Sequence, residues 1–501
     1  MAPDPVLQDW QGTVSMPSSL QNFDGLDNGD NQSVIGFEIM PPDTQGDVGP
    51  NHYVQWVNLA FAIWDKSGNL LYGPAAGNTL WSGFGGPCQD TNDGDPITLY
   101  DPLADRWLMS QFALPSYPQG PFYQCIAIST SDDPTGSWYR YAFEWENGDG
   151  FDVMNDYPKF GVWPDAYYMT ANQFSAGSGA WAGTGVAAFE RDRMLTGQSP
   201  QVVYFDLGPS DWGSMLPADL DGFAPPPPGA PNYLVEANAD EWEPGLSDVL
   251  QVYEFHVDWA NPLNSTLTQV TTLPTAPFDG DMCGFSQDCI PQPDTSQRLD
   301  AIGDRLMHRL QYRNFGSHET LVTNLTVDTN GNDHAGVRWF ELRRIGGDWS
   351  IHQQGTYAPD SDHRWMGSIA MDKVGNIALG YSVSGSSTYP SIRYAGRLAN
   401  DPLGTLGQGE AELVAGSSYQ AGGSRWGDYS MMAVDPLDDC TFWYTQQYVS
   451  EPGSWGNWNT RIGSFQFPGC LGPTGILAGI VRDSDSGEPI VGARVTACLL
   501  Y

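Results

Sequence analysis

The chain has 501 residues, 40% of them hydrophobic, with 19 Trp, 23 Tyr and 21 Phe, which is enough apolar material for a large core. Acidic residues number 60 against 21 Lys and Arg, for a net charge of −39 at pH 7. This balance argues against nucleic acid as a partner, because phosphate contacts need patches of Lys and Arg. No apolar run approaches the ~18 residues that a membrane-spanning helix needs, so membrane insertion is not expected.

The first segment, residues 1–35, is rich in Gln, Asn, Asp and Ser and is predicted to be irregular. Residues 33–40 (SVIGFEIM) have the composition of a strand. We expect this strand to pair with the last repeat of the chain and to remove an exposed sheet edge.

A hairpin pattern then recurs along the chain: an apolar run, a turn rich in Asp, Pro or Gly, and a second run that ends in amide side chains. A third apolar run and usually a fourth follow each hairpin. The repeats lie roughly 50–75 residues apart, a spacing typical of propellers. The hairpins cover 43–58, 95–113, 156–174, 231–238, 304–325, 363–384 and 425–449, and the third strands 125–130, 185–190, 250–257, 336–343, 391–398 and 461–467.

We therefore predict an all-β fold, a seven-bladed β-propeller over residues 36–470. Six or eight blades are the alternatives, because the fourth repeat is weakly marked. Helical periodicity is almost absent from the sequence.

Seven cysteines accompany the repeats, and none has the paired spacing of a zinc site. Pairing them repeat by repeat predicts three disulfides and leaves Cys498 in the tail. Such bridges fit an oxidising compartment, so a secreted, extracellular protein is expected. The expected pairs are Cys88–Cys125, Cys283–Cys289 and Cys440–Cys470.

The composition changes at Cys470-Leu471-Gly472-Pro473, beyond which the chain reads TGILAGIVRDSDSGEPIVGARVTACLLY. Its Gly-x-Val-x-Asp, Ser-Gly-x-Pro and Gly-Ala-x-Val elements resemble the start of a carboxypeptidase-regulatory-like module, a transthyretin-type β-sandwich. The resemblance implies that residues 471–501 are the incomplete start of such a module. It also implies further extracellular modules in the same parent chain.

Polar residues recur at matched positions of the repeats. In a propeller the first strand of each blade starts at the mouth of the central channel and the second strand returns there. Carboxylates that open first strands and amides that end second strands should therefore converge. Crowded carboxylates raise one another's pKa, which suits a general acid beside an ionised partner.

From this convergence we predict catalytic roles for Asp95, Asp156 and Asp428, without assigning which is acid and which is base. The predicted substrate-binding residues are Asp43, Gln111, Asn172, Gln173, Asp304, His363, Arg364, Trp365, Arg425, Trp426, Tyr429 and Gln446. No cofactor is required for this chemistry. Calcium is the alternative ligand of such a ring, since it takes carboxylate and amide oxygens.

Two short motifs carry a second resemblance. The sequence SDDPTGSW at 131–138 resembles a turn of five-bladed furanosidase-type glycoside hydrolases and, with one extra residue, the sialidase Asp-box. Asp95-Pro96 resembles the dipeptide that opens inner strands in the same hydrolases. The main body, with GDVGPNHYVQWVN and RWGDYS, resembles a group of secreted bacterial propellers found beside adhesion-type modules, which implies architecture and compartment but no activity.

Together these patterns predict a secreted glycan-active propeller, a glycoside hydrolase that acts at the channel mouth on a carbohydrate or glycoconjugate. One alternative is a non-catalytic carbohydrate-binding or adhesion propeller stabilised by calcium. A further alternative is a polysaccharide lyase with Tyr429 or His363 as base and an arginine against a uronate. The substrate and the bond cleaved are not specified by the sequence.

Overall fold

The computed structural model describes residues 4–242, 245, 247–286, 288–453 and 455–471. The expected module at 471–501 lies outside this part of the chain except for Leu471. The fold is all-β: within these described ranges, five sheets have four strands each, one has nine, and one has two. Among the described residues, no helix is long and apolar enough to cross a membrane.

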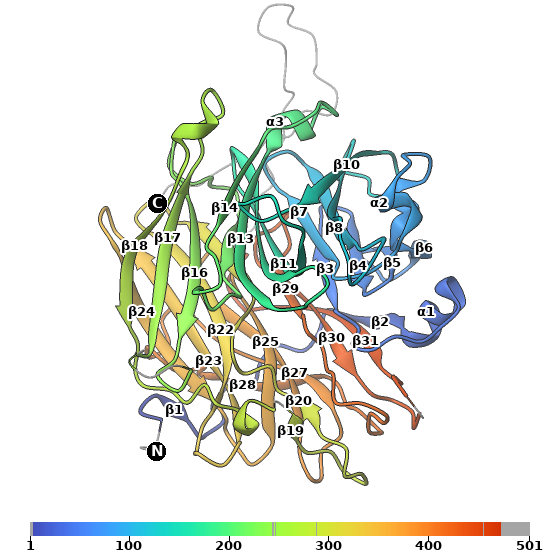
Figure 1. Ribbon diagram of the computed structural model, residues 1–501. Coiled ribbons are helices and arrows are strands. Elements are labelled where there is room, and N and C mark those ends of the chain that lie inside the picture. The colour runs from blue at the N-terminus through green and yellow to red at the C-terminus, as the bar shows by residue number, and fades with distance from the viewer. Residues whose placement is uncertain (1–3, 243–244, 246, 287, 454, 472–501) are drawn as a thin grey trace, which may run out of the picture.

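The first three repeats each form one antiparallel four-stranded sheet, as Figure 1 shows in blue to green. Their strands are β3 (Gln45–Val48), β4 (His52–Val57), β5 (Ala60–Asp65) and β6 (Leu70–Ala76); β7 (Ile97–Asp101), β8 (Arg106–Ala113), β9 (Phe122–Ser129) and β10 (Trp138–Trp145); and β11 (Val153–Val162), β12 (Ala166–Ser175), β13 (Trp181–Glu190) and β14 (Val202–Asp206). Short helices η1 (Gly77–Trp81) and α2 (Pro87–Asp90) precede the second sheet, and α3 (Arg191–Met194) follows β13.

The fourth and fifth repeats share the nine-stranded sheet, because β15 pairs in parallel with β21. Their strands are β15 (Leu216–Leu220), β16 (Asn232–Asn238), β17 (Val249–His256) and β18 (Thr266–Pro274), then β21 (Leu306–Asn314), β22 (Glu319–Asp328), β23 (Ala335–Arg344) and β24 (Trp349–Tyr357). The short helix η2 (Pro262–Asn264) connects β17 to β18, and η3 (Cys283–Phe285), β19 (Asp288–Ile290) and β20 (Leu299–Asp300) lie between β18 and β21. The ninth strand, β1 (Leu7–Gln8), pairs in parallel with β24.

The last two repeats are again separate four-stranded sheets. They consist of β25 (His363–Met371), β26 (Ile377–Ser384), β27 (Ser391–Arg397) and β28 (Gln408–Val414), and of β29 (Met431–Val434), β30 (Thr441–Tyr448), β31 (Asn459–Gln466) and β2 (Gln21–Asp27). The strand β2 comes from the N-terminus and pairs antiparallel with β31. The chain is therefore closed by its two ends, as expected, although by a different segment.

The expected strand over 33–40 is wrong. Residues of this stretch finish α1 (Asn28–Ile35), which starts with a capping box between Asp27 and Asp30. The box satisfies two free backbone donors and favours a helix at this point. Gly36, at φ 90°, ends the helix in the left-handed conformation. Residues 1–35, expected to be irregular, thus contain two strands and a helix.

The first strands of the repeats contact one another in a closed cycle, in the order β3, β7, β11, β15, β21, β25, β29 and back to β3. In Figure 1 the labels of β3, β7, β11, β25 and β29 gather in the middle of the view. A cycle of inner strands with sheets that extend outward is the arrangement of a propeller. The matched starts of the first strands therefore meet around one axis.

The core consists of layers between neighbouring sheets. Between the first two sheets, for example, Trp56, Phe61 and Ile63 pack against Trp107 and Met109, all almost fully buried. Burial of each such side chain stabilises the fold by about 1.5–3 kcal/mol. A strand with a neighbouring sheet on each side needs apolar residues on both of its faces. This requirement explains the even apolar runs of the predicted third strands. In the structure these strands are β9, β13, β17, β23, β27 and β31.

All three predicted disulfides are present: Cys88–Cys125, Cys283–Cys289 and Cys440–Cys470. Cys498 lies outside the described residues. Three disulfides are consistent with an extracellular protein.

Candidate functional site

A repeated backbone feature marks the mouth of the channel. Near the start of each of the seven first strands, one residue other than glycine has a positive φ, between 43° and 62°. This conformation is uncommon for such residues and is found where surrounding structure enforces it, often at functional sites. The residues are Asp43, Asp95, Tyr157, Ser214, Ile302, Met366 and Asp428.

Six of these seven residues, all except Met366, line one cavity of about 620 Å³. We call it the ring cavity. Its carboxyl groups come from five repeats and are Asp43, Asp95, Asp156, Asp300, Asp304 and Asp428. Its cations are Arg305 and Arg425, its amides Asn58 and Asn172, and its aromatic residues Tyr157, Phe174, Trp181 and Trp212.

Hydrogen bonds fix the carboxyl groups of the ring cavity. Asn58 donates through Nδ2 to Asp43 Oδ2 at 2.6 Å, which joins the end of β4 to the start of β3. The backbone N–H of Tyr157 donates to Asp95 Oδ2 at 2.9 Å and so links the second and third repeats. In the first repeat the second strand's amide thus supports the first strand's carboxylate.

Asp156 and Asp428 have different supports. Asp156 lies opposite Asn172 in the pairing of β11 with β12. Asn172 in turn accepts a hydrogen bond from the backbone N–H of Ser214 at 2.8 Å. Asp428 Oδ2 accepts a hydrogen bond from Arg425 Nη2, an ion pair at the start of the seventh repeat.

Burial and mutual repulsion raise the pKa values of these acids. Burial raises the pKa of Asp95 to about 8, with further increases from Asp156 and Asp428. The pKa of Asp43 is raised well above its ordinary value by burial and then by Asp428. For Asp156 the same two causes raise the pKa, while Arg305 and Lys159 oppose them. Carboxyl groups that share a site cannot all ionise easily.

The basic groups of the ring cavity are already occupied. Arg305 donates to both oxygens of Asp304, at 2.7 and 3.0 Å. Arg425 pairs with Asp428 and approaches Asp300 at 3.7 Å. Beneath the cavity floor, Lys159 is buried against the rings of Tyr157 and Tyr429, and burial lowers its pKa well below the ordinary value.

The structure brings together all five predicted carboxylates. Asp43, Asp95, Asp156, Asp304 and Asp428 line the ring cavity, with Asn172 and Arg425 beside them. Tyr429 lies just behind, fully buried, with its hydroxyl 3.4 Å from Asp95 Oδ2.

The remaining predicted binding residues do not line the ring cavity. Gln111, Gln173 and Gln446 are fully buried; Gln446 donates to the backbone of Met366, and Gln173 accepts from Trp145 and Tyr204. These amides belong to the second strands, but their side chains point into the packing between sheets. Amides at strand ends therefore divide into two groups, and only Asn58 and Asn172 reach the cavity.

The predicted binding residues at 363–365 and 426 also lie outside the ring cavity. Arg364 is fully buried between Asp360 and Glu410, both of which it contacts through two hydrogen bonds. His363 stacks edge-on against His334. Trp365 and Trp426 pack on each other in the core, with ring centres 5.7 Å apart. In the sixth repeat the left-handed turn comes at Met366, inside β25, and Arg364 and Trp365, which precede it, are fully buried.

Several cavity residues were missed. Ser214, Trp212, Asp300 and Ile302 belong to the fourth and fifth repeats. The residues are positioned by the left-handed turns at Ser214 and Ile302. No local signal distinguishes these turns in the sequence.

No preformed metal cluster lies in the ring cavity. In the described part of the chain, three groups of metal-type ligands have ligand atoms within 4.8 Å of one another, and none contains a residue of this cavity. One of the three contains the cysteines of the Cys283–Cys289 disulfide. Calcium, the alternative ligand of the ring, stays a prediction.

No known protein family matches the chain, and no curated protein matches it by sequence. Solved structures give distant similarities. A protein of unknown function from Dyadobacter fermentans has 12% identity over 90% of this chain and 99% of its own, with a TM-score of 0.38.

The Penicillium chrysogenum α-L-arabinanase complexed with arabinobiose has 10% identity over 79% of this chain and 99% of its own, with a TM-score of 0.36. The Trypanosoma rangeli sialidase in complex with sialic acid has 10% identity over 75% and 54%, with a TM-score of 0.35. The fold described above is therefore defined by the strand pairing of this chain itself.

Proposed function

We propose that the protein is a secreted glycan-active enzyme, a glycoside hydrolase whose reaction takes place in the ring cavity. One observation carries the proposal: Asp43, Asp95, Asp156 and Asp428 come from four consecutive repeats of the cycle and share one cavity. The pKa values of the first three are raised. Glycoside hydrolysis needs a protonated carboxyl and an ionised one on either side of the same bond.

Asp95 fits the role of general acid. Its pKa of about 8 keeps it protonated at neutral pH, so it can give its proton to the glycosidic oxygen as the bond breaks. The hydrogen bond from Tyr157 N–H holds one oxygen in place. Tyr429 supplies a buried hydroxyl behind that oxygen.

Asp428 fits the role of the partner carboxylate. Its side chain forms an ion pair with Arg425. Its charge contributes to the raised pKa of Asp43, Asp95 and Asp156, and different environments for neighbouring carboxyls are how acid and base roles are separated. As a base, Asp428 would take a proton from the attacking water; as a nucleophile, it would bond to the anomeric carbon, and water would then release the sugar.

The charges of the ring cavity favour a neutral sugar. Six carboxyl groups face two guanidinium groups. Each guanidinium is held by a carboxylate, Arg305 by Asp304 and Arg425 by Asp428. A uronate or a sialic acid would have to displace one of these partners and approach the other carboxylates. Phe174, Trp181 and Trp212 supply aromatic surface for the apolar face of a sugar ring.

These charges also weigh against the lyase alternative. A lyase would need a base at the cavity and a cation for the uronate. Tyr429 is fully buried, and His363 is paired with His334 outside the cavity. Both arginines of the cavity are paired.

A calcium-stabilised binding propeller is the second candidate. Two buried carboxylate oxygens, Asp43 Oδ1 and Asp428 Oδ1, accept no hydrogen bond from the described residues. Such oxygens are suitable calcium ligands. A rise in melting temperature with CaCl₂ that EDTA reverses, together with no hydrolysis of any glycan, would favour this candidate.

The deciding experiment is a hydrolysis screen of neutral polysaccharides beside polygalacturonate and sialyllactose, with release of reducing ends as the readout. We expect turnover of a neutral glycan and its loss in Asp95→Asn and Asp428→Asn. Asp192→Asn is the matched control, because that side chain is 88% exposed on α3. Full activity in both cavity variants would eliminate the proposed enzyme. The anomer released, followed by NMR, distinguishes Asp428 as base from Asp428 as nucleophile.

A further inference from the structure

We propose that a groove on the outer wall of the protein is a second carbohydrate site, one that binds a neutral oligosaccharide without cleaving it. The groove has a volume of about 300 Å³, and we call it the outer groove. Its defining residues are Phe61, Tyr72, Thr79, Ser137, Trp138 and Arg140. The site goes beyond the proposed hydrolase and does not depend on it.

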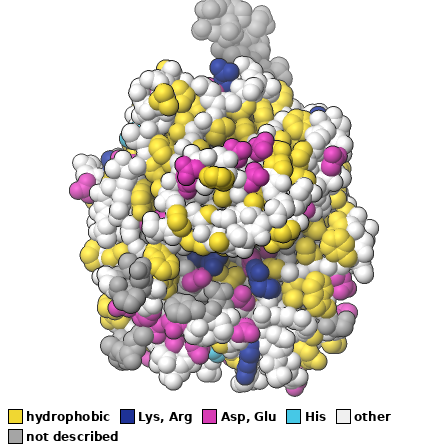
Figure 2. Space-filling model, viewed as in Figure 1, with side chains coloured by type: hydrophobic (Ala, Val, Ile, Leu, Met, Phe, Trp, Pro, Cys, Tyr) yellow, Lys and Arg dark blue, Asp and Glu magenta, His cyan; other side chains and the backbone are white. Residues whose placement is uncertain are grey.

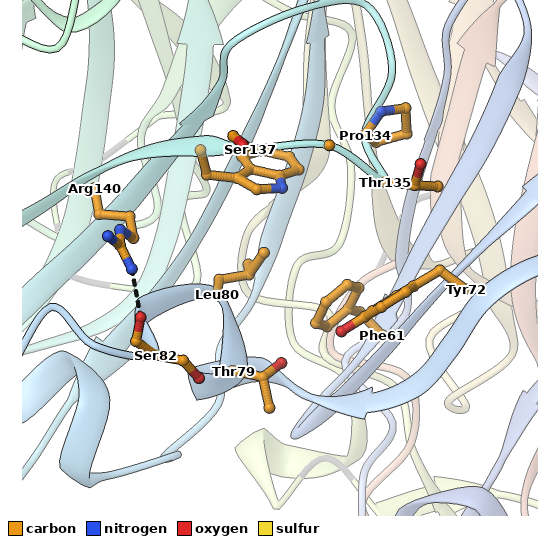
Figure 3. Close-up of a pocket in the computed structure, with 11 residues that line it drawn as sticks. Phe61, Tyr72, Thr79, Leu80, Ser82, Pro134, Thr135, Ser137 and Arg140 are labelled. Carbon is orange, nitrogen blue, oxygen red and sulfur yellow. Dashed lines mark hydrogen bonds between the residues drawn. The ribbon is translucent and has the colours of Figure 1, made fainter.

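The outer groove is separate from the ring cavity. Its walls are β6 and β10, the outermost strands of the first two sheets, whereas the ring cavity is built at the starts of the innermost strands. Figure 3 shows its three sides: the loop with Pro134, Thr135 and Ser137 above, the segment with Thr79, Leu80 and Ser82 below, and the rings of Tyr72 and Phe61 at one end. No residue lines both sites.

One end of the outer groove is an aromatic platform. The rings of Phe61 and Tyr72 stack with centres 5.7 Å apart and planes 27° apart. Phe61 is buried, while Tyr72 is 42% exposed. Trp138, half-buried, adds a second aromatic wall. A rigid ring fixed from behind and open in front suits the C–H face of a pyranose, which is apolar and flat.

The other end of the outer groove carries hydrogen-bond donors. Arg140 donates through Nη1 to the backbone oxygen of Ser82 at 2.6 Å, the dashed line in Figure 3. Within the described part of the chain, no acceptor binds its Nε or Nη2. A guanidinium held by one nitrogen presents the others as a fork, which matches two neighbouring sugar oxygens. The hydroxyl of Ser137 also lines the outer groove.

The charge of the molecule selects among glycans. Arg140 is the one charged side chain among the residues that line the outer groove. The whole chain carries a net charge of −39, which repels polyanionic polysaccharides over distances beyond the groove. On the face seen in Figure 2, acidic side chains likewise outnumber basic ones. A neutral oligosaccharide is therefore the ligand class that fits.

The floor of the outer groove is rigid before any ligand arrives. The indole N–H of Trp81, at the end of η1, donates to the backbone of Tyr141 in β10 at 3.3 Å. Asn78 donates to the backbone of Gln89 at 2.8 Å, which joins η1 to α2. The Cys88–Cys125 disulfide fastens α2 to β9. A preformed site loses little conformational entropy on binding.

The test is calorimetric titration of the full chain with cellohexaose, xylohexaose and mannohexaose, in an Asp95→Asn background so that no substrate is consumed. We expect one of these probes to bind, and Tyr72→Ala and Arg140→Met each to weaken that binding at least tenfold. Tyr72→Phe keeps the platform and should bind within twofold of the parent. Trp10→Ala is the matched control, since Trp10 is a 44% exposed aromatic outside the groove.

Two results would overturn the outer site: binding of none of the three hexasaccharides, or undiminished binding by both Tyr72→Ala and Arg140→Met. Neither result bears on the hydrolase, whose activity is measured separately on the otherwise native chain. Tyr72→Ala in that chain should keep the turnover of a short soluble substrate. Hexasaccharide binding that is retained in Asp95→Asn but weakened by Tyr72→Ala, with turnover retained in Tyr72→Ala alone, would separate the two sites.

Discussion

Tyr157 donates its backbone N–H to Asp95 Oδ2 at 2.9 Å, across the boundary between the second and third repeats. Both residues have positive φ angles, 52° and 47°. Each left-handed turn thus positions the other, and the acid of one repeat is supported by the backbone of the next. Several predictions about the ring cavity depend on this contact.

The first prediction concerns proton donation by Asp95. Asparagine at this position can still accept the Tyr157 hydrogen bond, so the fold should survive, but it cannot donate a proton to the leaving group. We expect Asp95→Asn to lower kcat on a neutral oligosaccharide by about 100-fold or more. The loss should be much smaller on the matching 4-nitrophenyl glycoside, whose leaving group needs no proton. An equal loss on both substrates would contradict the acid role.

The second prediction concerns the pH dependence of activity. Asp95 acts only while protonated, and its pKa is about 8. Activity should therefore decline as pH rises through about 8, where an exposed carboxyl would have lost its proton near pH 4. The measurement is kcat/KM between pH 5 and 9.5. A decline that starts below pH 6 would show that another group carries the proton.

The third prediction concerns stability against pH. Asp47, Asp95 and Glu236 each have a pKa raised to about 8 by burial. Between about pH 4 and pH 8 the folded chain holds protons that the unfolded chain has released, so the free energy of unfolding falls as pH rises. The melting temperature should be higher at pH 5 than at pH 8, and Asp95→Asn should flatten the slope.

Surface repulsion in this acidic chain acts in the same direction, and salt separates the two causes. Exposed charges are largely screened at 0.5 M NaCl, whereas buried groups are not. The slope of melting temperature against pH should persist in that salt. A flat profile at 0.5 M NaCl would assign the effect to the surface alone.

Much of the ring cavity could be read from the sequence because its chemistry follows the repeat. Asp43, Asp95, Asp156 and Asp428 stand at matched positions before or within the first strand, and a rotational repeat brings matched positions together. Aspartate also tolerates the left-handed turn that this position requires. The aspartates therefore suit both the local turn and the position that the repeat gives them.

The errors have two physical sources. Strand-end amides and arginines look alike in sequence whether they face a channel or a packed sheet, and Gln173, Gln446 and Arg364 face the packing. The closing strand was misplaced because a run such as SVIGFEIM has strand composition, while the capping box between Asp27 and Asp30, just before this run, favours a helix. The helix cap at Asp27 had more influence on the structure of this segment than its strand-like composition.

The fourth prediction concerns the Cys88–Cys125 disulfide. Its cysteines are 37 residues apart, against 6 for Cys283–Cys289. Loop-closure entropy then assigns about 4 kcal/mol to the first bridge and about 2 kcal/mol to the second. Urea unfolding of Cys88→Ala/Cys125→Ala and of Cys283→Ala/Cys289→Ala should show this order. The reverse order would mean that the second bridge stabilises chiefly through native contacts.

The last prediction concerns Arg364, which the sequence suggested for substrate binding and the structure places in the core. Its guanidinium is fully buried, with Glu410 at 2.8 and 3.0 Å and Asp360 at 2.8 and 3.0 Å. Arg364→Leu leaves Glu410 buried beside fewer positive charges, so we expect a loss of about 3–5 kcal/mol in the free energy of unfolding. Arg193→Leu removes a half-exposed pair with Glu190 and should cost less than about 1 kcal/mol. Below its melting temperature Arg364→Leu should keep the KM of the parent, since the side chain lies outside the ring cavity. A stable variant with a raised KM would instead show that Arg364 contributes to substrate binding.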